Sequence, residues 1–265
     1  TRAFSFSQQQ GFEARYSWYR DTLIEAYRVY GLKFDFISAD SNETDTADET
    51  WILYLKGRLD MEKDAPYDFQ KIKLVASDEV GTRNIAAQMV ENFKLRNAVD
   101  VIGLHYNTYG DSYTNLLNEA YGKEIWYSEG IAPCNLSHLT VQADGCGISG
   151  KDGAIDVANR IINSYYNGKM CMYEFLPAIA AYYDGSCNSP KHLICANEPW
   201  SGNYRLDSGF WMAMHWGRFS PKGWMFVNGA CYGDGEENHY IANTSNNFMT
   251  LVSPDRSEMT MHFTN

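Results

Sequence analysis

The sequence predicts an α/β protein built on a (β/α)8 barrel, and three observations support this. Apolar runs that suit strands alternate with segments of helical periodicity, polar residues follow the strands, and no Gly-rich phosphate loop follows any of them. Near-continuous apolar strands joined through helices are typical of a parallel sheet that is covered on both faces. A barrel carries its active site at the carboxyl ends of its strands, whereas a dinucleotide-binding sheet requires the glycine-rich loop. The pattern therefore favours the barrel.

The first half of the chain begins with a predicted helix at residues 13–31, on which tyrosines recur at helical spacing. Gly31 is a good helix stop. Residues 32–43 are expected to contain a strand of six or seven residues that finishes in a polar turn. The segments that follow are expected at 49–60 (helix), 71–79 (strand) and 84–98 (helix). In the last of these, Ile85, Met89 and Phe93 lie at helical spacing.

The second half continues the alternation up to about residue 224 and then changes. The expected segments are 99–110 (strand), 114–122 (helix), 123–130 (strand), 153–168 (helix), 169–181 (strand) and 208–219 (helix). From Met225 onward, short β-prone runs separated by Asn, Asp, Ser and Pro indicate an antiparallel module. We therefore predict a partial barrel domain at 1–224 and the start of a β-sandwich module at 225–265.

Composition restricts the kind of ligand. The formal net charge of −11 and the sequence pI near 5.0 disfavour nucleic acid or an anionic membrane surface as the main partner. Nineteen Tyr and seven Trp are enough to supply platforms for the apolar faces of sugar rings, although they could equally pack the core. No run of about 20 apolar residues is present, so we expect no transmembrane segment.

The cysteines and glycosylation triplets favour an exported protein. Six cysteines gather toward the C-terminal half, and the local pairs to test are Cys134 with Cys146 and Cys187 with Cys195. Neither pair has the CxxC spacing of a metal site, so no metal is expected. Sequons occur at Asn42, Asn135 and Asn243. We expect an extracellular or lysosome-like location.

Carboxylates at strand ends suggest glycoside hydrolysis. The run "KEIWYSEG" is an apolar strand that ends on Glu129, and a carboxylate beside aromatic rings is costly to desolvate unless it is paired or used. Glu43, preceded by Asn42, ends a strand earlier in the chain, with two strands between them. One carboxyl group could protonate the leaving oxygen and the other could attack the sugar.

Three further residues near these strand ends could serve the same site. His105 and Tyr106 could orient the nucleophile or bind the sugar, although a core histidine is an equal alternative. Asp78 could bind a hydroxyl group, or it could only cap the helix that follows it.

Several motifs together resemble the galactocerebrosidase family of retaining β-galactosidases, glycoside hydrolase family 59. They are "KIKLVASDE", "VDVIGLHY", "KEIWYSEG", "NSYYNGKM" and "ANEPWSGNYRLDSGFWMAMHWGRFSPKGW", in this order. The resemblance implies that Glu43 is the acid/base and Glu129 the nucleophile, and that Asn42 binds the hydroxyl next to the anomeric carbon. Trp200, in "EPWSG", is then a substrate-binding candidate. No cofactor is implied.

The chain differs from this family in sequence and in length. Ser41 stands where the family has a Trp before its Asn-Glu pair, and Ala132 replaces a hydroxyl residue after the nucleophile. If Glu43 follows strand four, strands 4–8 are present and strands 1–3 have no residues here. We expect the missing barrel half to come from a longer chain or from another chain.

Two hypotheses about the function follow from these observations. The first is a retaining β-glycosidase acting on a carbohydrate or glycolipid, with a terminal β-galactoside as the expected substrate and a β-glucoside or β-xyloside as weaker options. The second is a catalytically impaired, glycosidase-like protein that binds glycans or has a structural role. Retention of Glu43 and Glu129 favours the enzyme, whereas Ser41 in place of the Trp, Leu176 near the end of the last barrel strand and the absent barrel half favour the second hypothesis.

Overall fold

The computed structural model describes most of the chain as two compact units. The described residues are 8–39, 47–79, 84–105, 110–130, 153–176, 178–180, 193–196, 198–206, 208–233 and 247–264. The first unit comprises Thr1–Gly103 with Ser112–Glu124, and the second comprises Leu104–Asp111 with Ile125–Asn265.

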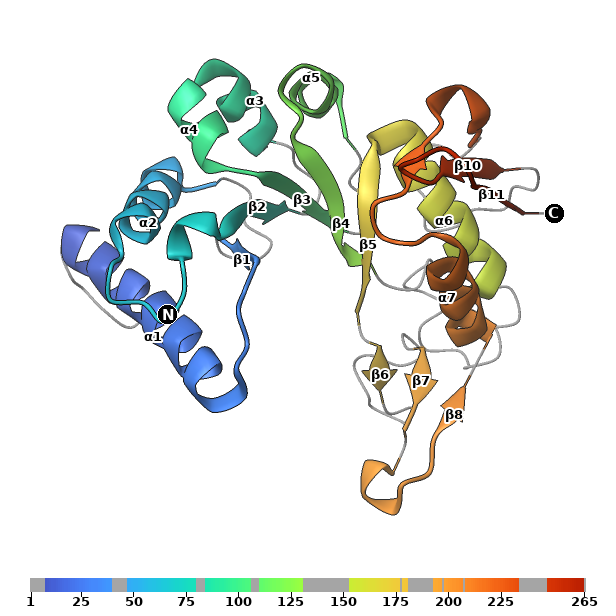
Figure 1. The fold of residues 1–265 in the computed structure, drawn as a ribbon, viewed down its shortest axis with the longest axis horizontal. Coiled ribbons are helices and arrows are strands. Elements are labelled where there is room, and N and C mark those ends of the chain that lie inside the picture. The colour runs from blue at the N-terminus through green and yellow to red at the C-terminus, as the bar shows by residue number, and fades with distance from the viewer. Residues whose placement is uncertain are drawn as a thin grey trace. The chain divides into compact units, whose positions relative to one another are not determined.

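The main sheet has five parallel strands whose order in the sheet follows the chain (Figure 1). They are β1 (Phe36–Ser38), β2 (Lys73–Glu79), β3 (Val101–His105), β4 (Glu124–Gly130) and β5 (Met170–Phe175). Helices lie between them in the sequence: α2 (Glu49–Met61), α3 (Asn84–Glu91) with α4 (Phe93–Ala98), α5 (Ser112–Tyr121) and α6 (Gly153–Gly168). This succession of strand and helix, with sequential strand order, is that of consecutive units of a (β/α) barrel, as predicted.

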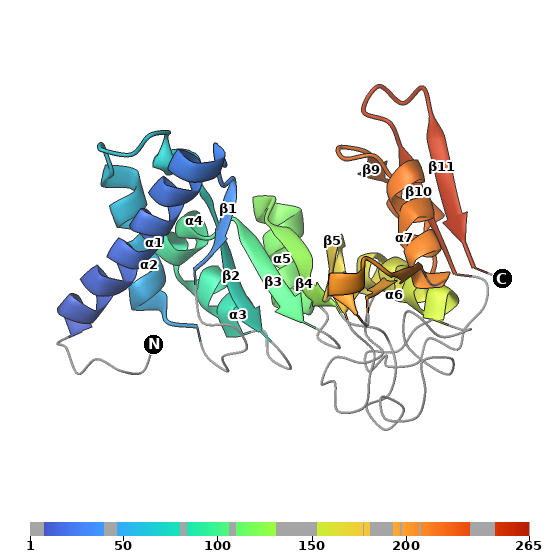
Figure 2. The same ribbon diagram turned by 90° about the horizontal axis from the view of Figure 1, so that it is seen from below.

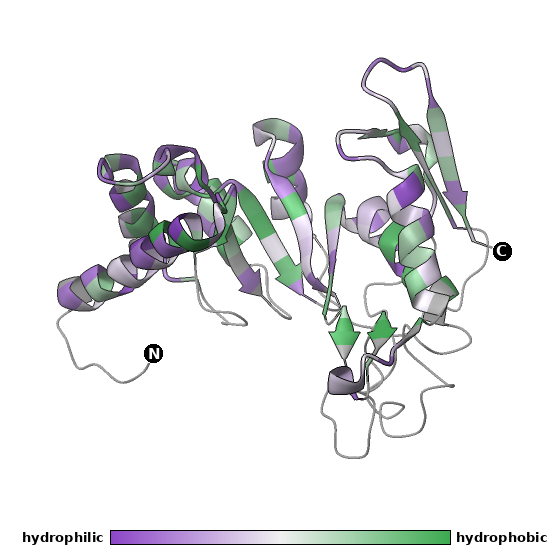
Figure 3. Ribbon diagram, turned by 60° about the horizontal axis from the view of Figure 1, so that its bottom comes forward, coloured by the Kyte–Doolittle hydropathy of each residue, from purple (hydrophilic) through white to green (hydrophobic). Residues whose placement is uncertain are grey.

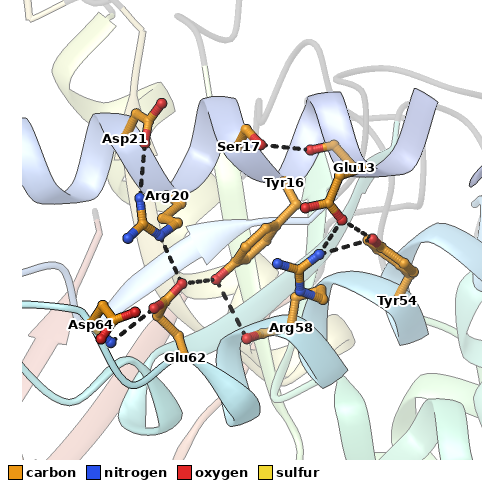
Figure 4. A network of polar contacts seen from close by, with 9 residues as sticks. All are labelled: Glu13, Tyr16, Ser17, Arg20, Asp21, Tyr54, Arg58, Glu62 and Asp64. Atoms are coloured by element: carbon orange, nitrogen blue, oxygen red, sulfur yellow. Dashed lines mark hydrogen bonds and ion pairs between the residues drawn. The ribbon is translucent and has the colours of Figure 1, made fainter. Parts of the chain in front are cut away.

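In the first unit, α1 (Gln8–Tyr30) packs on α2. Hydrophilic and hydrophobic residues alternate along α1 (Figure 3), and Tyr16 and Leu23 supply its buried face. Trp51 of α2 is fully buried, and its indole N–H donates to the backbone oxygen of Ala39. A polar network joins the two helices along the edge of this contact (Figure 4). The short helix η1 (Phe69–Lys71) leads into β2.

Two predicted elements of the first unit differ from the structure. The helix expected at 84–98 is two helices, because the Asn92 side chain accepts hydrogen bonds from the N–H groups of Lys94 and Leu95 and thereby starts α4. Phe93 is consequently 59% exposed instead of continuing the face of Ile85 and Met89. Within 32–39, the described part of the segment expected to hold a strand of six or seven residues, the strand is the three-residue β1.

In the second unit, α6 is buried on several sides. Figure 2 shows α6 and α7 (Ser208–Phe219) beside a sheet of β9 (Met225–Phe226), β10 (Phe248–Val252) and β11 (Met259–Phe263). This sheet is antiparallel, as expected for the C-terminal segment. The hydrophobic core of this region contains residues of α6, of the sheet and of the turn near η4 (Asn228–Ala230). They are Val157, Ile161, Ile162, Tyr165, Cys231, Met249 and Leu251.

A second small sheet was not predicted from the sequence. The segment 169–181, expected to be a strand and its exit, holds β5 and then β6 (Ile179–Ala180). Strand β6 pairs with β7 (Ile194–Cys195), which pairs with β8 (Arg205–Leu206). Figure 1 shows these short strands beyond the end of β5. Strands of two residues carry no detectable period, so the sequence gives no signal for them.

Some sequence predictions stay untested. The domain boundary at Met225 remains a prediction. Both proposed cysteine pairs include residues outside the described ranges. Within the described part of the chain, no helix is long and apolar enough to cross a membrane.

Candidate functional site

Glu129 lies at the carboxyl end of β4, where the strand is irregular. Ile125, Trp126 and Tyr127 before it are buried, which explains why "EIWY" forms a central strand. Tyr127 pairs with Tyr173 and Gly130 with Phe175, so β4 carries one residue more than β5 over this interval. Glu129 lies within this bulge. Bulges re-aim side chains and are frequent next to active sites.

His105 reaches Glu129 from the end of the neighbouring strand. All five residues of β3 are buried, and the His105 side chain is 1% exposed. Its Nδ1 lies 3.8 Å from Oε2 of Glu129, whose side chain is 18% exposed. The predicted pair of His105 and Glu129 is therefore together in the second unit. An imidazole at this distance attracts the carboxylate when it is protonated.

Aromatic rings lie beside the strand that carries Glu129. The rings of Tyr127 and Tyr173 stack with centroids 4.5 Å apart, and Tyr173 in turn contacts Phe175. Arg160 of α6 donates from Nη1 to the hydroxyl oxygen of Tyr127 at 3.0 Å. Arg160 is not among the site residues expected from the sequence, although an Arg inside the apolar run "VANRII" is a detectable signal.

Asp78 lies in the first unit, near the end of β2. Ser38, at the end of β1, donates its hydroxyl to the Asp78 carboxylate. Asp78 has a φ of 55°, in the left-handed region that few residues other than glycine adopt. Backbone strain of this kind gathers at functional positions, and Asp is among the residues that tolerate it best.

Trp200 lies on a tight turn between β7 and β8. Pro199 begins the short helix η3 (Pro199–Ser201), Ser201 donates its hydroxyl to the Glu198 backbone oxygen, and Gly202 closes the turn with a φ of 78°. The Trp200 side chain is 84% exposed. The "EPWSG" motif therefore forms a defined turn that presents an aromatic ring to solvent.

The remaining predicted site residues lie outside the described ranges. These are Glu43, Asn42 and Tyr106. Among the residues that the structure does describe, no group of three His, Cys, Asp or Glu side chains could hold a metal ion.

Comparison with known protein families decides the assignment. Residues 5–218 match the model of glycosyl hydrolase family 59. The chain belongs to this family. The match includes the strands that carry His105 and Glu129 and the turn that carries Trp200, and it confirms the family that the sequence motifs indicated.

Relatives of this family 59 chain are galactocerebrosidases. The protein from Danio rerio is 31% identical over 206 residues, which cover 77% of this chain and 27% of the relative. The human protein is 29% identical over 207 residues, covering 77% and 26%. The chain thus spans about a quarter of the length of these relatives.

Solved structures show the same fold at lower identity. SrfJ from Salmonella typhimurium superposes with a TM-score of 0.69 at 13% identity, over 96% of this chain and 55% of SrfJ. An endo-β1,6-glucanase superposes with a TM-score of 0.63 at 11% identity, over 93% of this chain and 55% of the glucanase. These likenesses confirm the barrel fold class of the family 59 chain.

Proposed function

We propose that this family 59 protein is a retaining β-glycosidase that hydrolyses a terminal β-galactoside, either galactosylceramide or a related glycoside. The observation that carries the proposal is the position of Glu129, in a bulge at the end of a central parallel strand and 3.8 Å from a buried histidine. The galactocerebrosidase relatives support the choice of sugar.

The reaction would proceed in two steps. The Glu129 carboxylate attacks the anomeric carbon while the Glu43 carboxyl group protonates the departing oxygen, giving a covalent galactosyl-enzyme. Glu43 then takes a proton from water, which attacks the same carbon and releases Glu129. His105 keeps the Glu129 carboxylate oriented during both steps.

The other candidates would bind the substrate. Asn42 binds the hydroxyl next to the anomeric carbon, and Tyr106 and Asp78 hydrogen-bond to the sugar. Trp200 offers an exposed aromatic face to the substrate. Asp78 suits this role because Ser38 already orients its carboxylate.

Hydrolysis of chromogenic β-D-galactoside, β-D-glucoside and β-D-xyloside tests the proposal. We expect turnover of the galactoside, and we expect Glu129→Gln and Glu43→Gln each to lower kcat by at least about 10³-fold, because each removes a group that acts in the transition state. Glu119→Gln is the matched control, since Glu119 is an exposed residue of α5. Absence of turnover on all three glycosides would refute the proposal.

We also propose that further strands, from the same longer chain or from another chain, complete the barrel, and that the protein acts in an extracellular or lysosome-like compartment. The partial coverage of the relatives and of the solved structures supports the first statement. Native mass spectrometry of the protein from its source, compared with the 30.2 kDa of this chain, tests it. A source protein of 30.2 kDa that remains active as a monomer would contradict it.

A further inference from the structure

We propose that Arg160 and Tyr127 are positioning residues for Glu129. This inference rests on the proposed role of Glu129 as the nucleophile. Contacts in the core of the second unit would then determine the position of the Glu129 carboxylate.

The bulge makes the position of Glu129 depend on Tyr127. Tyr127 is the last β4 residue in register with β5 before the bulge, and Gly130 is the next. On the β5 side, the regular pairing is interrupted between these two residues, so Tyr127 is the last residue before Glu129 that β5 holds in register. The direction of Glu129 therefore depends on how Tyr127 is held.

Tyr127 is held on two sides. Its ring is fully buried and stacks on Tyr173 at an interplanar angle of 16°. Its hydroxyl oxygen accepts a hydrogen bond from Arg160, which is itself 2% exposed. A buried guanidinium is costly to desolvate, and its hydrogen bonds are stronger than those between neutral groups. The Arg160 hydrogen bond therefore limits movement of the Tyr127 ring within the plane of the ring, and the stacking on Tyr173 limits movement out of that plane.

The helix that carries Arg160 is itself anchored on another side. The adjacent residue, Asn159, is fully buried, and its Oδ1 accepts from Nδ2 of Asn247 at 2.9 Å and from the hydroxyl of Thr264. Asn247 and Thr264 flank β10 and β11, and the Thr264 N–H donates to the Asn247 backbone oxygen. Consecutive residues of α6 thus connect the C-terminal sheet with the strand that bears Glu129.

Tyr127→Phe gives the most selective test, because it keeps the stacked ring and removes only the acceptor of the Arg160 hydrogen bond. We expect kcat on the β-galactoside to fall by about 10- to 100-fold with KM changed by less than about 3-fold, since small displacements of a reacting group cost this much.

Arg160→Met should reproduce the loss, and Arg160→Lys should recover part of it because its ammonium can still donate to Tyr127. Tyr166→Phe, which removes the hydroxyl of an exposed tyrosine on the same helix, should leave kcat unchanged. Crystal structures of the wild type and of Tyr127→Phe give a readout that needs no activity: the separation of His105 Nδ1 and Glu129 Oε2, 3.8 Å here, should grow by about 1 Å in the variant.

The outcomes separate this inference from the proposed function. If the wild type hydrolyses none of the glycosides, the proposed function fails, while the crystallographic separation still decides whether Tyr127 positions Glu129. An unchanged separation in Tyr127→Phe would overturn the positioning role. An unchanged kcat in Tyr127→Phe, with an active wild type, would overturn it as well.

Discussion

Two polar networks in this molecule are built from similar side chains in different surroundings. The first joins α1 to α2, where Arg58 pairs with Glu13 and Arg20 pairs with Glu62 (Figure 4). Three of these four side chains are at least 31% exposed. The second lies on α6, where Asn159, Arg160, Asn163 and Ser164 are all almost fully buried.

The difference between the networks is the availability of water. When an exposed ion pair is broken, water solvates both charges. Such a pair therefore typically contributes less than about 1 kcal/mol to the free energy of unfolding. A buried donor that loses its acceptor has no replacement and costs about 1–3 kcal/mol. The α6 network therefore holds its side chains in one arrangement, because breaking it is costly. The α1–α2 network stabilises the fold mainly through its buried aromatic rings.

The largest effect is expected for Asn159→Ala in the buried network. The substitution removes the acceptor of Asn247 and Thr264 together, so the free energy of unfolding should fall by about 2–4 kcal/mol. Urea denaturation measures this. Ser164→Ala, which loses one bond within its own helix, should cost less than half as much. Equal costs for the two variants would contradict the special role of Asn159.

A smaller effect is expected for Tyr16→Phe in the α1–α2 network. The Tyr16 ring is buried and its hydroxyl donates to Oε2 of Glu62 at 2.8 Å. Burial and the Glu62 carboxylate both raise the pKa of Tyr16. Glu62 retains Arg20 and the Asp64 N–H as partners, so the loss should be about 1 kcal/mol in thermal or urea unfolding. A loss of unfolding free energy above about 2 kcal/mol would show that the α1–α2 network contributes as much per hydrogen bond as the buried α6 network.

The buried histidine on β11 should make the stability of the second unit depend on pH. Burial, followed by the nearby His215, lowers the pKa of His262, which hydrogen-bonds to Ser220 at 2.7 Å and stacks on Trp216. Because the folded protein favours neutral His262, its contribution is complete above the ordinary pKa of 6.5 and is lost as the pH falls below it.

We therefore expect the melting temperature to fall between pH 7.5 and pH 5.5 and His262→Gln to flatten this slope. Carboxylates with lowered pKa values, such as Glu62 and Asp255, titrate below this window and do not contribute to the slope. An identical slope in the wild type and in His262→Gln would exclude His262 as its source.

The smallest effect is expected for Glu13→Gln. Glu13 is 49% exposed, and its hydrogen bonds with Tyr54 and its pairing with Arg58 lower its pKa. The substitution should change the free energy of unfolding by less than about 0.5 kcal/mol, and high salt should abolish the change. A loss of unfolding free energy as large as that of Tyr16→Phe would contradict the expectation that exposed charges stabilise the fold less than buried rings do.

Strand–helix alternation could be predicted from the sequence because it depends on local periodicity. The apolar run of β4 and its terminal Glu129 were both visible in "KEIWYSEG", and the "EPWSG" turn carried Pro and Gly in the positions that such a turn requires. The split at Asn92 was missed because a capping side chain overrides the apolar spacing around it.

Contacts between distant segments could not be predicted in the same way. The bulge that contains Glu129 is a property of two paired strands, and no spacing within β4 reveals it. The hydrogen bonds of Asn159 join residues 88 and 105 positions apart. Arg160 could be noticed as a charge in an apolar run, but its partner Tyr127 becomes evident only in the fold.

The identity of the nucleophile is tested most directly by trapping the covalent intermediate. The protein is incubated with 2-deoxy-2-fluoro-β-D-galactosyl fluoride, digested with pepsin and analysed by tandem mass spectrometry. We predict one fluorogalactosyl group, attached to Glu129. A label on any other residue, or turnover of the β-galactoside without a trapped adduct, would contradict the account.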